Sequence, residues 1–309
     1  MNHILVTGAA GHIGSALVER LLSFPEYHVV AVDNLLSGRR EKLPIEQLPN
    51  FTFIQADVND YNQIRRVLTS YQFDYIFHYA AVVGVQRTLE KPLLVLNDIQ
   101  GIRFMLDLSR ETGVSRVFFS SSSEVYGEPV EFPQNAHSTP LNSRLPYAVV
   151  KNVSEAFLRS YHKEYGLSYT IFRFFNTYGP RQSDDFVITR FLKQALAGQP
   201  VTIYGDGSQI RTFCYIDDNI DVTVNCLRQN LCTNDVMNIG SDVEISVHGL
   251  ALRIIDVLRS PSKLNFLPAL KEGDMTRRLP DNSRMKEVLR RPLTTLDQGL
   301  KMTIDKRMF

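Results

Sequence analysis

The stretch TGAAGHIGS, residues 7–15, decides the fold of this chain. It lies between an aliphatic run, Ile4–Val6, and a segment whose leucines recur at helical spacing, so it joins a strand to a helix. Its three glycines allow a tight turn, a close approach of the backbone to a pyrophosphate and close packing of helix on strand. The spacing is GxxGxxG, whereas the common dinucleotide fingerprint is GxGxxG. The loop residues expected at a dinucleotide are Gly8, Gly11, His12, Ile13 and Gly14, with His12 as a packing residue.

An acidic residue, Asp33, ends the second expected strand 19 residues beyond Gly14. A carboxylate there can bond both hydroxyls of a ribose and would repel a 2′-phosphate, so it favours NAD over NADP. Arg39 and Arg40 follow closely and leave the alternative of a 2′-phosphate open. Asp57, which ends the third strand, either meets the adenine or caps the next helix. The remaining expected cofactor contacts are Asn34, Val58, Ala80 and Ala81.

The first half of the chain alternates strand-like runs with helical segments. This alternation predicts an α/β fold, a Rossmann-type doubly wound parallel sheet with helices on both faces. The expected strands are His3–Gly8, His28–Asp33, Phe51–Asp57, Tyr75–Ala80, Arg116–Ser122 and Tyr169–Phe175. The expected helices are Ser15–Phe24, Tyr61–Ser70, Pro92–Thr112 and Tyr147–Gly166.

After about Asn176 the pattern breaks into shorter runs separated by Gly, Pro and Asp. These runs predict a smaller C-terminal α+β lobe that binds the substrate. We therefore expect a cofactor domain over residues 1–176 and a substrate lobe over 177–309, interleaved at a soft boundary. The runs assigned to the lobe are Phe191–Ala197, Val201–Gly205, Met237–Gly240 and Val247–Leu258.

Composition excludes several other functions. With 34 basic and 33 acidic residues the formal charge is +1, so no global field favours nucleic acid or an anionic membrane. No apolar run approaches the roughly 20 residues of a membrane-spanning helix, and the N-terminus lacks signal-peptide features. The three cysteines lack metal-ligand or redox spacing. We therefore expect a cytoplasmic protein without a disulfide or a metal.

Tyr147 and Lys151 are four residues apart at the start of an expected helix, so their side chains share one face. A nearby ammonium favours the phenolate, and it would bring the pKa of Tyr147 down from about 10. The serine-rich run Ser120–Glu124 lies at the carboxyl end of an expected central strand, where ligands bind in open α/β sheets. The pair therefore predicts a tyrosine that accepts a hydroxyl proton.

These motifs together resemble the extended short-chain dehydrogenase/reductases, in particular the NAD-dependent nucleotide-sugar epimerase/dehydratase family. The resemblance covers nearly the whole chain. The motifs that carry it are TGAAGHIG (7–14), AVD (31–33), HYAA (78–81), SSSSEVYG (120–127), YAVVK (147–151), FFNTYGPRQ (174–182), YGDGSQIRTFCYIDD (204–218) and NIG (238–240).

The resemblance implies a role for each matching residue. Tyr147 would be the base, Lys151 would bond the nicotinamide ribose and lower the pKa of Tyr147, and Ser122 would bond the reacting sugar hydroxyl. Asn176 and Arg211 would hold the nucleotide diphosphate. Further expected substrate contacts are Val85, Lys271 and Arg278.

The sequence departs from the family pattern at two places. Asp98 stands where the family usually has an asparagine, three residues before Gly101, and Ile102 replaces a threonine. Lys271 stands where many epimerases have an arginine. Neither departure removes a catalytic group, but both weaken the transfer of substrate detail.

The common step of the family is oxidation of the sugar C4 hydroxyl, with Tyr147 taking the proton and NAD the hydride. Glu124 distinguishes the later steps, because simple epimerases usually have a small or neutral residue there. Ser123 and Glu124 resemble the Thr-Ser-Glu of uronate decarboxylases, as Arg278–Asp281 resembles their RxPD segment. In a decarboxylase Glu124 would orient the uronate or a water, with Arg278 as its counter-charge.

Other observations leave alternatives open. Ala81–Gln86 lacks the ASPASP-like segment of typical decarboxylases and resembles an epimerase. We therefore expect a UDP-sugar as substrate, in a UDP-glucuronate decarboxylase-like or dehydratase-type reaction, with a UDP-sugar 4-epimerase as the alternative. A Rossmann protein that senses NAD without catalysis is a distant alternative, because such proteins typically lack the tyrosine or the lysine.

The family commonly builds a four-helix interface, so we expect a homodimer formed by the Pro92–Thr112 and Tyr147–Gly166 helices. Apolar side chains on these segments either supply the contact or belong to the core between helix and sheet. They are Ile102, Met105, Val153 and Phe157.

Overall fold

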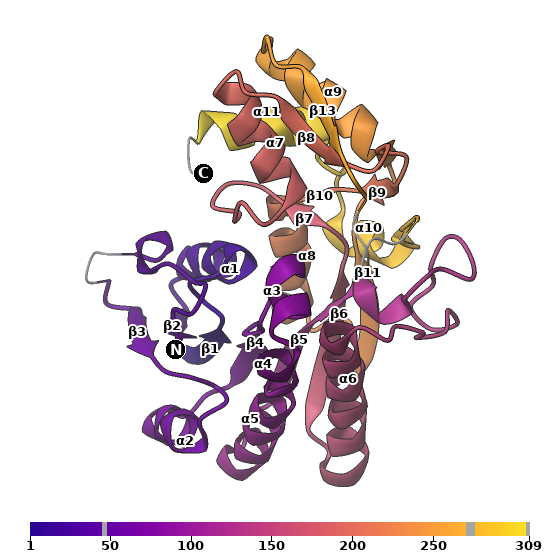
Figure 1. Cartoon of the computed structure of the whole chain (residues 1–309). Coiled ribbons are helices and arrows are strands. Elements are labelled where there is room, and N and C mark those ends of the chain that lie inside the picture. Colours follow the sequence, from indigo (N-terminus) through magenta and orange to yellow (C-terminus); the bar gives the residue numbers. More distant parts are fainter. Residues whose placement is uncertain (45–47, 270–275, 307–309) are drawn as a thin grey trace.

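The computed structural model describes residues 1–44, 48–269 and 276–306 and contains a seven-stranded sheet whose neighbouring strands are all parallel (Figure 1). The strand order is β11-β6-β5-β4-β1-β2-β3, so the order reverses between β1 and β4. Ligands of open α/β sheets bind at such a switch point, beyond the carboxyl ends of the strands. The strands are β1 (Asn2–Thr7), β2 (Tyr27–Asp33), β3 (Phe51–Gln55), β4 (Tyr75–His78), β5 (Arg116–Ser122), β6 (Ser168–Phe174) and β11 (Asp235–Ile239).

Alternating side chains of each strand pack on opposite faces of the sheet. On β1, Ile4 and Val6 belong to one buried cluster and Leu5 to another, and all three are fully buried. The first cluster includes residues of α1 (His12–Leu22) and α8 (Ile216–Arg228). The second includes residues of α2 (Tyr61–Ser70), α5 (Asp98–Thr112) and α6 (Pro146–Tyr165). A sheet covered on both faces explains the continuous apolar runs of its central strands, such as Val29–Val32 of β2.

The predicted doubly wound sheet is confirmed, and the six expected strands lie within two residues of their expected bounds. The expected helix Pro92–Thr112 is instead two helices, α4 (Pro92–Leu96) and α5. The Gln100 N–H bonds the Asn97 carbonyl three residues back, which interrupts the regular four-residue ladder. A short helix, α3 (Val85–Glu90), precedes them and was not expected.

The remaining elements form a smaller lobe beyond the carboxyl ends of the sheet (Figure 1). Of the run Met237–Gly240, which was expected in this lobe, the first three residues belong instead to β11, the edge strand that pairs with β6, and Gly240 directly follows the strand. Three two-stranded sheets lie outside the main sheet: β7 with β10, β8 with β13, and β9 with β12. The bounds are β7 (Thr177–Tyr178), β8 (Val201–Tyr204), β9 (Ile210–Thr212), β10 (Cys214–Tyr215), β12 (Glu244–Ser246), β13 (Leu264–Leu267), α7 (Val187–Leu196), α9 (Val247–Leu258), α10 (Ser283–Leu289) and α11 (Leu296–Asp305), with single 3₁₀ turns η1 (Arg40–Lys42) and η2 (Ser123–Tyr126).

Two side chains expected at a dimer contact lie elsewhere. Ile102 and Met105 are buried between α5 and the sheet, at 1% and 0% exposure. A dimer built on these helices would have to use their outer residues, such as the partly buried Val153 and Phe157. No helix in the described ranges combines the length and apolarity needed to cross a membrane.

Candidate active site

A cavity of about 1200 Å³ runs along the carboxyl ends of the strands and reaches into the lobe. Most of the expected site residues line this cavity, and they come from both halves of the chain. The selected residues that line it are Gly8, Gly11, His12, Ile13, Gly14, Asp33, Asn34, Asp57, Val58, Ala80, Ala81, Ser122, Ser123, Glu124, Tyr147, Lys151, Asn176 and Arg278.

Of the other selected residues, one lies outside this lining and two are not described at the level of side chains. Arg211 lies in β9, outside the lining, and bonds the Ile210 carbonyl. Val85 begins α3, and the structure describes its backbone only. Lys271 falls outside the described residues. Within the described ranges no cluster of three His, Cys, Asp or Glu side chains could hold a metal ion.

The glycine loop is shaped by close backbone contacts. Gly8 has φ +66°, and a Cβ there would lie 2.6 Å from the Ala80 nitrogen. A Cβ on Gly14 would lie 2.1 Å from the Gly8 carbonyl oxygen. Helix α1 starts after Gly11 without a side-chain cap, which leaves its first N–H groups for an anion. This part of the cavity fits the pyrophosphate of a dinucleotide.

The Asp33 carboxylate is held by backbone groups at the end of β2. Its Oδ2 accepts a hydrogen bond from the Ala10 N–H at 2.9 Å, and its Oδ1 accepts one from the Leu35 N–H at 2.8 Å. Burial raises the pKa of Asp33. Each oxygen keeps a second lone pair, so the carboxylate can still accept from ribose hydroxyls.

This placement predicts a cofactor preference. A fixed, buried carboxylate accepts hydroxyl donors but repels a 2′-phosphate, so we expect the protein to bind NADH at least about tenfold more tightly than NADPH, as charged hydrogen bonds are strong. Calorimetric titration with each cofactor measures this ratio. Equal affinities would contradict this role of Asp33 and would indicate that Arg39 accommodates a 2′-phosphate, since it lines the cavity. Arg40, the other arginine noted in the sequence, lies outside the lining and donates to the Pro44 carbonyl.

Tyr147 and Lys151 project from the first turns of α6 toward the end of β5. Lys151 is buried, and its Nζ lies 4.7 Å from the centroid of the Phe119 ring and 5.7 Å from that of Tyr147. Burial lowers the pKa of Lys151 to about 8, while the carboxylates of Asp98 and Glu155 act in the opposite direction. The two side chains therefore share one wall of the cavity, as the four-residue spacing indicated.

The expected effect of Lys151 on Tyr147 is corrected by the structure. The pKa of the Tyr147 hydroxyl is raised, first by burial and then by the Glu124 carboxylate, while Ser122 and Arg278 act to lower it. The spacing alone could not show this, because Glu124 approaches from another element. A nearby positive charge favours the phenolate, and Arg278 already acts in this direction.

Asp98, noted in the sequence only as a departure, has a defined place at the cavity. Its Oδ2 accepts from the Val82 N–H at 2.8 Å, and its Oδ1 accepts from the Asn59 amide at 3.0 Å. It is the leading charge that raises the pKa of Lys151. Asp98 thus acts as a fixed counter-charge for the buried ammonium.

The Asp98→Asn variant should therefore lose activity at lower pH than the wild type. Lys151 is charged below its pKa, and removal of the carboxylate that raises this pKa moves the loss of charge downward, by on the order of one pH unit. The alkaline limb of kcat/KM against pH measures the shift. Asp107→Asn on the same helix is the matched control, and an unmoved limb in Asp98→Asn would rule out the counter-charge.

Glu124 and Arg278 form an ion pair in the cavity wall. The Arg278 Nη2 donates to Glu124 Oε1 at 2.6 Å, and its Nη1 donates to Ser123 Oγ at 3.4 Å. The counter-charge expected for Glu124 is therefore present. Glu124 Oε2 and Arg278 Nε are buried and have no hydrogen-bond partner in the described part of the chain.

Some lining residues were missed from the sequence. Arg87 follows the epimerase-like segment, and its guanidinium lies 3.6 Å from Asp185, so it joins α3 to the loop before α7. Arg181 belongs to the quoted FFNTYGPRQ motif but received no role. Arg181 could have been selected because it lies within a quoted motif. No sequence pattern singled out Arg87.

The fold and this cavity define a Rossmann-type protein with a tyrosine, a lysine and a serine in the cavity wall. The family model described as "NAD dependent epimerase/dehydratase family" matches residues 4–240. The chain belongs to this family and uses NAD.

Individual relatives are similar over almost their entire length. A UDP-N-acetyl-alpha-D-glucosaminuronate decarboxylase of Bacillus cytotoxicus is 34% identical, with 97% of this chain and 96% of the relative covered. A UDP-glucose 4-epimerase of Mycolicibacterium smegmatis is 35% identical, with 97% of each chain covered. The solved UDP-glucuronic acid 4-epimerase of Bacillus cereus, in complex with UDP-glucuronic acid and NAD, is 31% identical, has a TM-score of 0.89, and covers 99% of this chain and 100% of its own.

Proposed function

We propose that this enzyme oxidises C4 of a UDP-hexuronate and then releases the C5 carboxylate as carbon dioxide, as a UDP-glucuronate decarboxylase does. The relatives named as uronate decarboxylases support the substrate class. The observation that carries the proposal is the Glu124–Arg278 ion pair beside Tyr147, in which Arg278 is buried and Glu124 is partly buried.

The first step needs the residues at the end of β5 and the start of α6. Tyr147 takes the proton of the C4 hydroxyl, Ser122 bonds that hydroxyl, and Lys151 bonds the ribose of the cofactor. NAD, when bound, accepts the C4 hydride and later returns it. The backbone N–H of Glu124 donates to Ser122 Oγ at 3.2 Å. The serine hydroxyl is therefore oriented by the residue that acts in the second step.

The second step explains the ion pair. A ketone at C4 makes the C5 carboxylate a β-keto acid, so the C5–carboxylate bond breaks and its electron pair forms the C4–C5 enolate. Arg278 holds the uronate and Glu124 holds Arg278 in place, since an unpaired second carboxylate would be repelled. A proton from water then adds to C5, the hydride returns to C4, and Tyr147 returns its proton to the C4 oxygen.

The ion pair weighs against inversion of a neutral sugar at C4. Burial of charged groups is costly, and apolar replacements of similar volume are often as stable. Inversion of a neutral sugar needs only rotation of the ketose and return of the hydride, whereas a uronate needs a partner for its carboxylate in either reaction. The similarity to 4-epimerases keeps a UDP-sugar 4-epimerase as the second candidate.

A panel of UDP-sugars tests the assignment. Purified protein is incubated with UDP-glucuronate, UDP-N-acetylglucosaminuronate, UDP-glucose and UDP-N-acetylglucosamine, and the product mass is measured. We expect a uronate to lose one carbon dioxide. An unchanged mass with inverted C4 would identify the 4-epimerase, loss of water a dehydratase, and no conversion of any sugar would reject the family of reactions proposed.

A further inference from the structure

We infer that a buried polar network behind the cavity positions Glu124 and Arg278 relative to Tyr147 for the step after C4 oxidation. We call it the Arg173 network. The inference rests on the proposed function, because it assigns these residues to its second step. The members, each at most 2% exposed, are Ser121, Tyr126, Gln134, Glu155, Arg173 and Asn238.

The first link joins the network to the helix that carries Tyr147 and Lys151. Glu155 lies one turn beyond Lys151 on the same face of α6. It accepts two hydrogen bonds from Arg173, at 2.9 Å from Nε and 2.7 Å from Nη2, and a third from Ser121 Oγ at 2.6 Å. Its pKa is lowered in spite of burial, because Arg173 favours the carboxylate. This link therefore ties α6 to β6 and to the residue before Ser122.

The second link reaches the turn that carries Glu124. Arg173 Nη1 donates to the Tyr126 hydroxyl at 2.9 Å, and this hydroxyl donates to Asn238 Oδ1 at 2.7 Å. Tyr126 is the last residue of η2, two residues after Glu124. One guanidinium thus contacts both the helix of the first step and the turn of the second.

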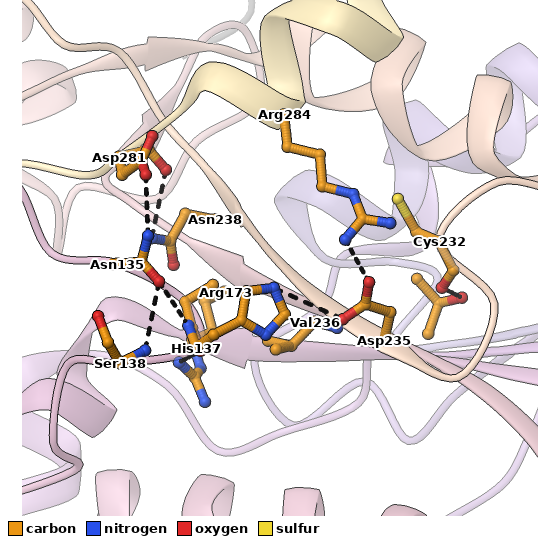
Figure 2. A network of polar contacts seen from close by, with 12 residues as sticks. Asn135, His137, Ser138, Arg173, Cys232, Asp235, Val236, Asn238, Asp281 and Arg284 are labelled. Carbon is orange, nitrogen blue, oxygen red and sulfur yellow. Dashed lines mark hydrogen bonds and ion pairs between the residues drawn. The ribbon is translucent and has the colours of Figure 1, made fainter.

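The third link holds the segment of Arg278. Asn238 Nδ2 donates to the Gln134 carbonyl at 2.7 Å, and the Gln134 N–H donates to the Leu279 carbonyl at 2.7 Å. Leu279 directly follows Arg278. A second hydrogen bond holds the same segment two residues further along the chain. There, Asn135 Nδ2 donates to Asp281 Oδ2 at 3.0 Å (Figure 2).

The ends of the network coincide with the reacting groups. Ser121 directly precedes Ser122, and Glu155 lies one helical turn from Lys151. Tyr126 lies two residues after Glu124. Gln134 bonds Leu279, which directly follows Arg278. A buried charge pair adds little net stability over well-packed apolar residues, so stability alone does not explain it. Catalytic groups, by contrast, have to be held within about 0.5 Å of the productive geometry. The members of the Arg173 network are therefore positioning residues.

The Tyr126→Phe variant tests this inference, because it deletes the hydroxyl between Arg173 and Asn238 and little volume. With UDP-glucuronate we expect C4 oxidation to stay within about twofold of wild type and release of carbon dioxide to slow by roughly tenfold to a hundredfold. Reduced cofactor should then accumulate on the enzyme. Stopped-flow absorbance of the reduced cofactor and the rate of carbon dioxide release measure the two steps separately.

The matched control is Tyr27→Phe. Tyr27 is also buried beside an arginine, Arg228, but it begins β2 at the opposite end of the sheet. It should leave both steps unchanged. Asn135→Ser is the second variant if Tyr126→Phe folds poorly, since Asn135 is only partly buried, and it should slow the same step.

The outcomes separate the network from the proposed function. Equal slowing of both steps in Tyr126→Phe, or no slowing in either Tyr126→Phe or Asn135→Ser, would overturn the positioning role of the network while the wild type still releases carbon dioxide. A wild type that oxidises C4 but releases no carbon dioxide would overturn the proposed function and this inference together.

Discussion

Replacement of Tyr147 by phenylalanine should lower turnover by about 10²–10⁴-fold while NAD stays bound, because general acid–base catalysis contributes on this scale. The change deletes one hydroxyl and little volume in the wall of the cavity. Ser122, Lys151 and the glycine loop keep their places, so the binding surfaces for cofactor and sugar remain. The loss should fall on kcat with little change in KM.

Steady-state kinetics with UDP-glucuronate and calorimetry with NAD measure the two effects of Tyr147→Phe. Tyr204→Phe serves as the control, because Tyr204 lies in β8 of the lobe and outside the cavity lining. Turnover of Tyr147→Phe at the wild-type rate would remove Tyr147 from the chemistry. Loss of NAD binding in this variant would instead mean that the Tyr147 hydroxyl maintains the structure of the cofactor site.

Replacement of Glu124 by glutamine has the second-largest expected effect. Glutamine keeps the shape but loses the charge that pairs with Arg278, so the uronate is held incorrectly after C4 oxidation. We expect reduced cofactor to form at near the wild-type rate and carbon dioxide release to fall by roughly a hundredfold, as for a misplaced reacting group.

The same stopped-flow assay separates the two steps of Glu124→Gln. Glu128→Gln is the control, because Glu128 is a few residues further along and bonds Thr276 at the surface. An unchanged overall rate in Glu124→Gln would favour the 4-epimerase. A variant that forms no reduced cofactor would mean that Glu124 organises Ser122 and Tyr147 before oxidation.

Local pattern was sufficient for much of the fold. Strand runs such as Val29–Val32 are apolar because both faces of the sheet are covered, and the glycine loop has to avoid backbone contacts such as that between Gly8 and Ala80. The break at Asn97 could not be predicted, because both sides of it favour helix. The place of β11 could not be predicted either, since pairing with β6 is a long-range contact.

The sequence predicted the site only where the interacting residues are close to one another along the chain. The i, i+4 spacing of Tyr147 and Lys151 placed both on one wall, but the pKa of Tyr147 depends on Glu124 from another element. The role of Asp98 depends on its distance in space from Lys151, which spacing does not show. Arg173 reads as an ordinary residue of a buried strand, and only the fold brings it to Glu155 and Tyr126.

The central claim is that hydride leaves C4 and returns to C4 while the carboxylate is lost from C5. The most direct measurement is turnover of UDP-glucuronate that carries deuterium at C4, with the product examined by NMR. We predict a UDP-pentose that keeps the deuterium at C4, together with one equivalent of carbon dioxide. A product that keeps its carboxylate, with deuterium on an inverted C4, would contradict the account and identify a 4-epimerase.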